Sequence, residues 1–95
     1  MSRVDRMRAA LEAGLQPQAL DIVDDSHRHA GHEGARDGRG HFSVRIVSSI
    51  FEGKLPLARH RAVYAALGTL METDIHALSI DARTPAESGR TGEAG

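Results

Sequence analysis

The sequence predicts an α+β fold with the order helix, strand, strand, helix, strand. Residues 19–24, 41–50 and 76–82 alternate in polarity, which is typical of strands with two different faces. Segments that begin near Val4 and Leu57 repeat apolar residues at helical spacing. The first two strands should pair antiparallel, whereas a helical crossover makes the third parallel to the second. We therefore expect a three-stranded mixed sheet with helices on one face.

Composition restricts the class of protein. The 95 residues suffice for one domain, in which 40% hydrophobic but only 3% aromatic content leaves Leu, Ile, Val and Ala to build the core. A net charge of −1 provides no broad basic field for nucleic acid or a membrane. The absence of cysteine excludes disulfides, a cysteine nucleophile and thiolate ligation by this chain alone. No apolar run is long enough to span a membrane, and the basic, amphipathic N-terminus is not expected to be a signal peptide, so a cytoplasmic location is expected.

The first helix is expected over residues 4–13. Ser2 can cap it, with Asp5 as the partner three residues later. Gly14 provides a natural stop, and Pro17 prevents easy continuation.

A short strand over residues 19–24 is followed by a long glycine- and histidine-rich loop over residues 26–40. No apolar period occurs in this loop, which contains His27, His29 and His32. Loops of this length in small domains are usually functional or disordered.

The second strand is expected over residues 41–50. Its alternation directs one set of apolar side chains to the core. This set consists of Phe42, Val44, Ile46 and Ile50.

The long helix should begin after Pro56, a residue suited to a first turn, and extend to about Glu72. A broad apolar stripe would lie against the sheet. Its members are Leu57, Val63, Tyr64, Leu67, Leu70 and Met71.

The third strand, over residues 76–82, should direct Leu78 and Ile80 to the core. We expect the domain to occupy residues 1–84. Residues 85–95 are polar and are expected to form a disordered tail.

Two motifs resemble the BolA family. Residues 51–67 read F-E-G-K-x-x-L-x-R-H-R-x-V-Y-x-A-L, and residues 75–80 read I-H-A-L-x-I. The resemblance covers residues 20–85. It implies a variant of the type II KH-like fold with the same α-β-β-α-β order.

Known catalytic motifs do not occur in this sequence. Lys54 lacks the preceding glycine of a P-loop, and neither a nucleophile elbow nor HExxH is present. His60 has no serine or carboxylate placed to suggest a triad. We therefore expect a protein that is not an enzyme.

A nucleic-acid site is the alternative interpretation. KH domains hold the nucleic-acid backbone with a GXXG loop, but the corresponding turn here reads G-K-L-P over residues 53–56. Lys54, Arg59, His60 and Arg61 form a candidate surface for DNA or a partner protein, although such clusters are more often solvated helix faces. His60 fits a structural role at the start of the helix as well. BolA-like proteins are linked to transcriptional regulation, so a DNA-binding regulator with a KH-like fold stays open.

The histidines indicate a metal function. Imidazole is a common metal ligand, and two histidines can replace two cysteines on one iron of a [2Fe–2S] cluster. Because this chain has no cysteine, a partner would have to bring the sulfur ligands.

The resemblance names that partner as a monothiol glutaredoxin. BolA-like proteins form heterodimers with it around a bridging [2Fe–2S] cluster, whose other ligands are the glutaredoxin cysteine and a glutathione thiolate. By resemblance, His76 and His29 would be the ligands here, with His27 and His32 as alternates, and the chain alone would carry no cofactor. The implied function is an adaptor for cluster transfer or iron regulation. Without the resemblance, His76 fits a sheet-edge residue, and His41 is expected to anchor the second strand.

Overall fold

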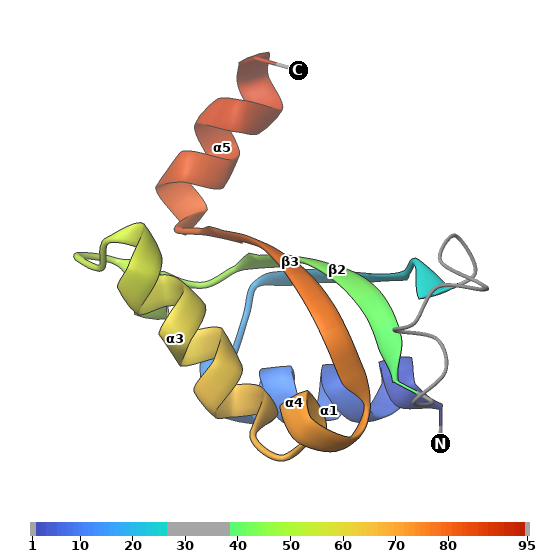
Figure 1. Cartoon of the computed structure of the whole chain (residues 1–95). Coiled ribbons are helices and arrows are strands. Elements are labelled where there is room, and N and C mark those ends of the chain that lie inside the picture. The colour runs from blue at the N-terminus through green and yellow to red at the C-terminus, as the bar shows by residue number, and fades with distance from the viewer. Residues whose placement is uncertain (1, 27–38, 95) are drawn as a thin grey trace.

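The computed structural model describes residues 2–26 and 39–94 and confirms the expected α+β fold. Its sheet has the order β1-β2-β3; β1 and β2 are antiparallel, whereas β2 and β3 are parallel. Helices α1 and α3 cover one face of this sheet (Figure 1). The elements in order are α1 (Arg3–Leu15), β1 (Ala19–Asp24), β2 (Gly40–Val47), the 3₁₀-helix η2 (Ser49–Phe51), α3 (Pro56–Leu67), α4 (Leu70–Thr73), β3 (Ile75–Arg83) and α5 (Pro85–Ala94).

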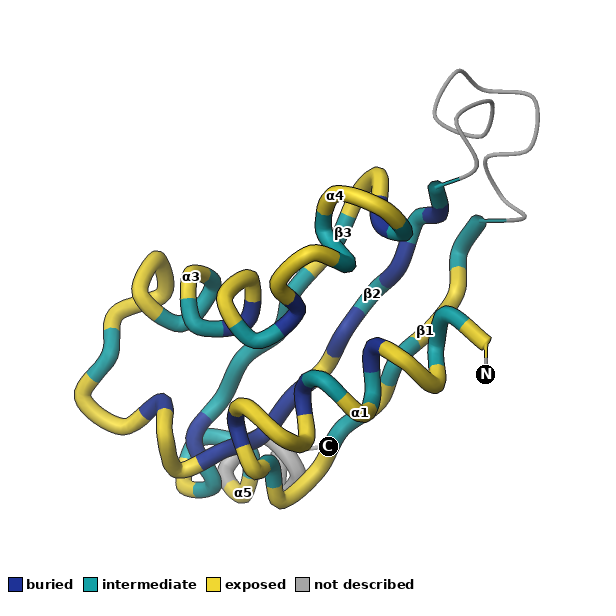
Figure 2. Tube along the Cα trace, turned by 90° about the horizontal axis from the view of Figure 1, so that it is seen from below, coloured by how far each residue is buried: buried dark blue, intermediate teal, exposed yellow. Residues whose placement is uncertain are grey.

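The core lies between the sheet and these two helices. The central strand β2 is buried along most of its length and faces the buried sides of α1 and α3 (Figure 2). Full burial of each large apolar side chain contributes about 1.5–3 kcal/mol. The buried cluster consists of Met7, Leu11, Leu15, Phe42, Val44, Ile46, Phe51, Val63, Leu67 and Ile75.

Helix α1 has the expected cap but continues past the expected stop. Ser2 and Asp5 form a complete capping box. The helix runs through Gly14 to Leu15, and Gln16, with φ of 46°, ends it. Gly14 serves close packing instead, because a Cβ there would lie 2.9 Å from Cβ of Ala66 on α3.

Strand β2 is shorter than expected. It ends at Val47, and the Ser48 side chain accepts a hydrogen bond from the Ile50 backbone to begin η2. This turn breaks the alternation of the strand. The expectation that Ile50 faces the core is therefore wrong: Ile50 is 44% exposed, and Phe51 is buried in its place.

The expected long helix is divided in two. Helix α3 ends at Leu67, Gly68 adopts φ of 57°, and α4 follows as a separate turn. Positive φ is accessible to glycine at little cost, which explains the break at this position. Val63 and Leu67, one turn apart, face the core.

Two members of the expected apolar stripe do not face the sheet. Leu57 is 61% exposed and Tyr64 is 41% exposed. Leu57 lies in the first turn of α3, and Tyr64 follows the buried Val63 by one residue, about 100° further around the helix.

The expected disordered tail is replaced by a helix. Strand β3 extends one residue beyond the expected range at each end, and α5 begins at Pro85. The Thr84 hydroxyl accepts a hydrogen bond from the Glu87 backbone, and the Glu87 carboxylate accepts one from the Thr84 backbone. This capping box, with proline in the first turn, explains why a polar segment begins a helix here.

The opposite face of the sheet carries charged and polar residues together with the exposed Val23. Arg45 on β2 pairs with Asp81 on β3 at 3.8 Å, and both line a shallow hollow of about 360 Å³ together with Asp21 and Ser43.

Among the helices that the structure describes, none has the length and apolar character needed to cross a membrane.

Candidate metal-binding and docking sites

Two histidines meet at the start of the parallel strands. His76 is exposed at the second position of β3, and His41 is half-buried at the second position of β2. The strand register pairs Gly40 with Ile75 but His41 with Ala77, so His76 is an extra residue in a β-bulge. The two imidazole centroids lie 5.2 Å apart with ring planes inclined at 52°. Bulges that redirect side chains are common next to functional sites.

Backbone contacts fix this end of the sheet. The Gly40 N–H donates to the Asp74 carbonyl at 2.9 Å, which joins the first residue of β2 to the residue before β3. The Asp25 N–H donates to the His41 carbonyl at 2.8 Å. The His41 N–H donates to the Ser26 hydroxyl at 3.1 Å. His41 is therefore held between the two neighbouring segments.

Asp74 anchors the approach to His76. Its carboxylate accepts hydrogen bonds from Thr73 and Arg6 and lies 3.4 Å from the Arg3 guanidinium. The Thr73 hydrogen bond, followed by the Arg6 hydrogen bond, lowers the pKa of the Asp74 carboxyl below its usual value. The turn before β3 is thereby tied to the start of α1.

The three predicted loop ligands, His27, His29 and His32, lie outside the described residues. Ser26, the last described residue before them, bonds to His41. Ser26 therefore lies beside His41, the neighbour of His76. Within residues 2–26 and 39–94, no group of three or more His, Cys, Asp or Glu side chains is arranged to hold a metal ion.

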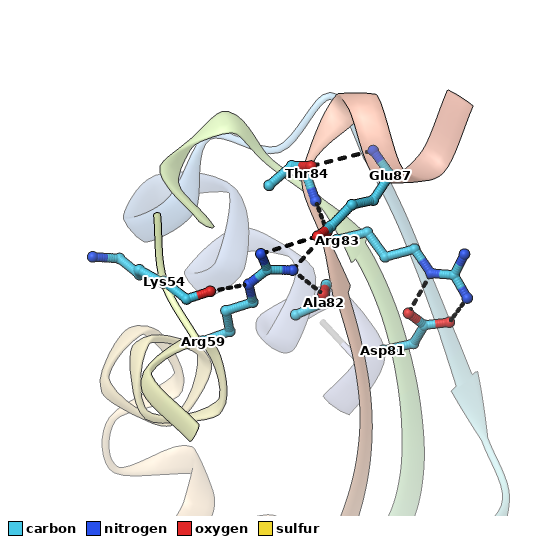
Figure 3. Close-up of polar contacts among 7 residues, drawn as sticks. All are labelled: Lys54, Arg59, Asp81, Ala82, Arg83, Thr84 and Glu87. Atoms are coloured by element: carbon cyan, nitrogen blue, oxygen red, sulfur yellow. Dashed lines mark hydrogen bonds and ion pairs between the residues drawn. The ribbon is translucent and has the colours of Figure 1, made fainter. Parts of the chain in front are cut away.

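The side chain of Arg59, one of the residues expected on a docking surface, makes several polar contacts within the structure. Its Nε donates to the Lys54 carbonyl at 2.8 Å, and its Nη1 donates to the Ala82 carbonyl at 3.2 Å. The same guanidinium makes a two-point ion pair with Glu87 at 2.6 and 3.2 Å (Figure 3). With only 14% of its side chain exposed, Arg59 connects the FEGK turn and α3 to β3 and α5.

The Arg59 ion pair has an electrostatic consequence for Glu87. The Arg59 hydrogen bond, followed by the Thr84 backbone hydrogen bond, lowers the pKa of the Glu87 carboxyl to about 2. Glu87 therefore stays charged at neutral pH and holds the first turn of α5 against the end of β3.

The remaining predicted surface residues lie around the start of α3. Arg61 is exposed, whereas Lys54 and His60 are partly buried. The structure adds two apolar members to this surface: Leu55, which is 77% exposed, and Leu57, which was expected to face the sheet. Arg61 and Tyr64 lie one turn apart on the outer side of α3. This mixed basic and apolar surface suits a protein partner better than a phosphate backbone alone.

Sequence reasoning missed two features of these sites. The nearness of His41 to His76 depends on the register between two strands whose first residues, Gly40 and Ile75, are 35 positions apart in the chain, and no local pattern encodes that register. The role of Glu87 did leave a signal, because T-P-A-E at residues 84–87 has the form of a capping box with proline in the first turn.

Known proteins resemble this chain over most of its length. Residues 11–87 match the family described as BolA-like protein. The chain is 47% identical over 90 residues to Protein BOLA1, chloroplastic, of Arabidopsis thaliana, covering 92% of this chain and 56% of that protein. It is 38% identical over 80 residues to the DNA-binding transcriptional regulator BolA of Escherichia coli, covering 84% of this chain and 73% of that one.

A solved structure matches the fold as well. BolA1 from Arabidopsis thaliana superposes with a TM-score of 0.78 and 44% identity, over 92% of this chain and 96% of that chain. The chain thus spans a little over half the length of the curated chloroplastic relative, but almost all of this solved domain.

Proposed function

Because this chain belongs to the BolA-like family, we propose that it is a non-enzymatic adaptor that binds a monothiol glutaredoxin and completes a shared [2Fe–2S] cluster. The adaptor would serve cluster transfer or iron regulation. In this proposal His76 and His29 are the ligands from this chain, with His27 and His32 as alternates. The glutaredoxin cysteine and a glutathione thiolate complete the cluster, and the chain alone carries none.

The position of His76 is the observation that carries the proposal. Its imidazole is exposed at the start of β3 and neighbours His41, which is bonded to Ser26, the last described residue before His27. A ligand to a shared cluster has to be accessible to the partner while its backbone stays fixed. The bulge and the hydrogen bond from Gly40 to Asp74 meet the second requirement.

The chemistry of the chain fits this role. With no cysteine in the sequence, only nitrogen and oxygen ligands are available here, and two imidazoles on one iron are a known cluster ligation. Imidazole in place of thiolate raises the reduction potential of such a cluster. An adaptor could therefore change the stability and transfer of the cluster without catalysing a reaction.

The proposal is tested by titrating the protein into cluster-loaded, glutathione-ligated monothiol glutaredoxin and recording visible circular dichroism. We expect a new spectrum that saturates at one to one and is lost with His76→Ala. Arg45→Ala, an exposed residue on the opposite face of the sheet, is the control and should leave the spectrum intact. An unchanged spectrum with the wild-type chain would reject the proposal. Retention of the new spectrum in His76→Ala would reject this ligand assignment.

The loop ligand requires its own comparison. His27→Ala, His29→Ala and His32→Ala are titrated in parallel, with loss of the spectrum expected only for His29→Ala. If His27→Ala or His32→Ala loses the new spectrum while His29→Ala retains it, the histidine replaced in that variant is the loop ligand.

A second function is supported by the Escherichia coli relative, the DNA-binding transcriptional regulator BolA. Of the four residues expected on this surface, Lys54, His60 and Arg61 remain for contacts with DNA, because the Arg59 side chain is held by Glu87. The net charge of −1 and the missing second glycine of a GXXG loop favour the adaptor over DNA binding. Duplex binding measured by fluorescence anisotropy, with charge reversal at Lys54 and Arg61, separates the two functions.

A further inference from the structure

We propose that the free edge of β1 pairs with the same edge of a second copy of this chain, which joins two three-stranded sheets into one continuous sheet. The sheet order is β1-β2-β3, so β1 has a neighbouring strand on one side only. The two β1 strands would run antiparallel about a two-fold axis, with Ile22 opposite Ile22 of the second copy. The assembly is independent of the adaptor function, because β3 and its His76 lie on the far side of β2.

The backbone of β1 presents every second residue to this edge. Just after β1, the Asp25 N–H donates to the His41 carbonyl of β2. Successive residues of an antiparallel strand direct their backbone groups to opposite sides, so the odd-numbered residues of β1 bond to β2. The even-numbered residues direct their N–H and C=O groups to the free edge. These are Leu20, Ile22 and Asp24.

Arg8 on α1 marks the free edge and gives it a positive charge. Its Nη1 donates to the Leu20 carbonyl at 3.3 Å, as expected for a carbonyl that faces away from β2. A guanidinium has several N–H donors, and this bond uses one of them. Among the residues that the structure describes, no carboxylate forms an ion pair with Arg8. The edge therefore offers a cation that a second chain can neutralise.

The two-fold register places an acidic partner opposite this cation. With Ile22 on the axis, Leu20 faces Asp24 of the second copy, and residues that face each other in a sheet direct their side chains to the same face. That face is the one covered by α1, because Leu20 packs against the core. The Asp24 carboxylate accepts from the Ser26 N–H at 2.9 Å and has acceptor capacity for a guanidinium as well.

This complementarity indicates a second copy of the chain as the occupant. Arg8 acts at Leu20, two residues before Ile22, and Asp24 lies two residues after it. A patch with opposite charges on either side of its centre is self-complementary, as a two-fold interface requires. The ion pair between Arg8 and Asp24 of the second copy would form once on each side of the axis.

The other edge of the sheet lacks this property. Leu20 of β1 and Ala82 of β3 pair with the same residue of β2, Ile46. The Ala82 carbonyl also accepts from an arginine, Arg59, but that guanidinium is already neutralised by Glu87. The β3 edge therefore offers no comparable charge to a second chain.

Apolar side chains on both faces of β1 would lose exposure in the dimer. Ile22, partly buried against the core, would meet its counterpart across the axis. Val23, 51% exposed on the other face, would be covered by the added strand. One strand from each copy makes a small interface, and small interfaces are weak. We therefore expect a reversible dimer that forms as the protein concentration rises.

The first test is amide hydrogen exchange of the full chain, followed by NMR over a series of protein concentrations. The Ile22 amide should exchange rapidly in dilute solution and become protected as the dimer forms. The Asp21 and Val23 amides, which bond to β2, are internal controls and should be protected throughout. Sedimentation velocity over the same series should show monomer converting to dimer. A chain that stays monomeric, or a dimer whose Ile22 amide stays unprotected, would overturn the proposal.

The second test exchanges the charges between copies. Arg8→Glu and Asp24→Lys should each weaken self-association at least about 10-fold, because each places like charges opposite one another. A mixture of the two variants should recover the wild-type dimer, since Glu at position 8 then meets Lys at position 24 and the native pair forms on the other side. Arg61→Glu, an exposed arginine on α3, is the matched control and should dimerise as wild type.

Ile22→Pro removes the outward N–H on the axis and leaves the ladder to β2 intact, so it should abolish the dimer. If this variant fails to fold, the charge variants still decide the question, because they leave the core unchanged. Dimers of wild-type strength in both charge variants would show that another surface joins the copies and would overturn the proposal. A mixture no stronger than its components would do the same.

Discussion

Arg59 was expected on a docking surface, but its side chain makes several polar contacts within the described structure. It donates to two backbone carbonyls and to Glu87, while most of its side chain is buried. Part of the sequence motif that indicates the family therefore encodes stability. A basic residue beside a docking surface is not for that reason a docking residue.

Replacing Arg59 should destabilise the fold. Arg59→Ala removes charge-assisted hydrogen bonds and leaves the Lys54 and Ala82 carbonyls without this donor, so we expect a loss of about 1–3 kcal/mol in unfolding free energy. The measurement is urea unfolding followed by circular dichroism. Arg61→Ala, two residues away on the same helix but exposed, is the control and should stay within about 0.5 kcal/mol of wild type. Equal effects of the two substitutions would contradict the structural role of Arg59.

The Arg59–Glu87 pair also predicts a pH dependence. The pKa of Glu87 is lowered from 4.5 to about 2 in the folded protein, so the unfolded chain takes up its proton first as pH falls. The contribution of Glu87 to stability is therefore fully present above about pH 4.5 and is lost between there and pH 2.

Comparison with Glu87→Gln isolates this contribution. In urea unfolding at several pH values, the difference between wild type and Glu87→Gln should shrink as pH falls through this window. The lowered pKa of Asp74 acts in the same direction but is common to both proteins, so it cancels. A difference that does not vary with pH would show that the ion pair contributes nothing.

At the scale of elements, the packing of α1 on α3 depends on a small residue in each helix. A Cβ at position 14 would lie 2.9 Å from Cβ of Ala66, too close for contact without a shift of one helix. Gly14→Ala gains about 1 kcal/mol of helix propensity but overpacks the crossing, which typically costs about 1–3 kcal/mol.

We therefore expect Gly14→Ala to be destabilising, and Ala66→Gly in the same chain to relieve the overlap. A double-mutant cycle measured by urea unfolding should give a coupling energy of the order of 1 kcal/mol. Additive effects of the two substitutions would mean that the helices do not meet closely at these positions.

The success of sequence reasoning differs between element types for physical reasons. Alternation identified all three strands because β2 has one face in the core, with Phe42 and Val44 buried as expected. The division after α3 and the burial of Phe51 were missed, since Gly68 and Ser48 change the backbone direction without changing the apolar count. Helix α5 was missed because it has no apolar period and depends on its cap.

At the scale of the whole molecule, two segments distant in sequence form the candidate metal site. His76 was identified through its motif, but its neighbour His41 became visible only when the parallel register brought the two strand starts together. Positions in a motif are thus easier to predict than the contacts between motifs.

The outer surface of α3 provides a test that distinguishes a protein partner from DNA. Leu57 is exposed beside Arg61, and we expect a combined Leu57→Ser and Arg61→Glu variant to lower glutaredoxin affinity at least about 10-fold, as for residues at the centre of an interface. Calorimetry with monothiol glutaredoxin measures this loss. Arg45→Glu, on the opposite face of the sheet, is the control and should bind as wild type.

DNA binding by the same surface would show a characteristic dependence of the affinity on salt concentration. Lys54 and Arg61 can neutralise about two phosphates, so the slope of log affinity against log salt should be no steeper than about −2. We expect weak duplex binding that the Leu57→Ser change leaves unaltered, because apolar side chains do not contact phosphates. A steep salt slope, together with duplex binding lost on Arg61→Glu and glutaredoxin binding retained, would contradict the adaptor function. That result would make the basic end of α3 a nucleic-acid interface.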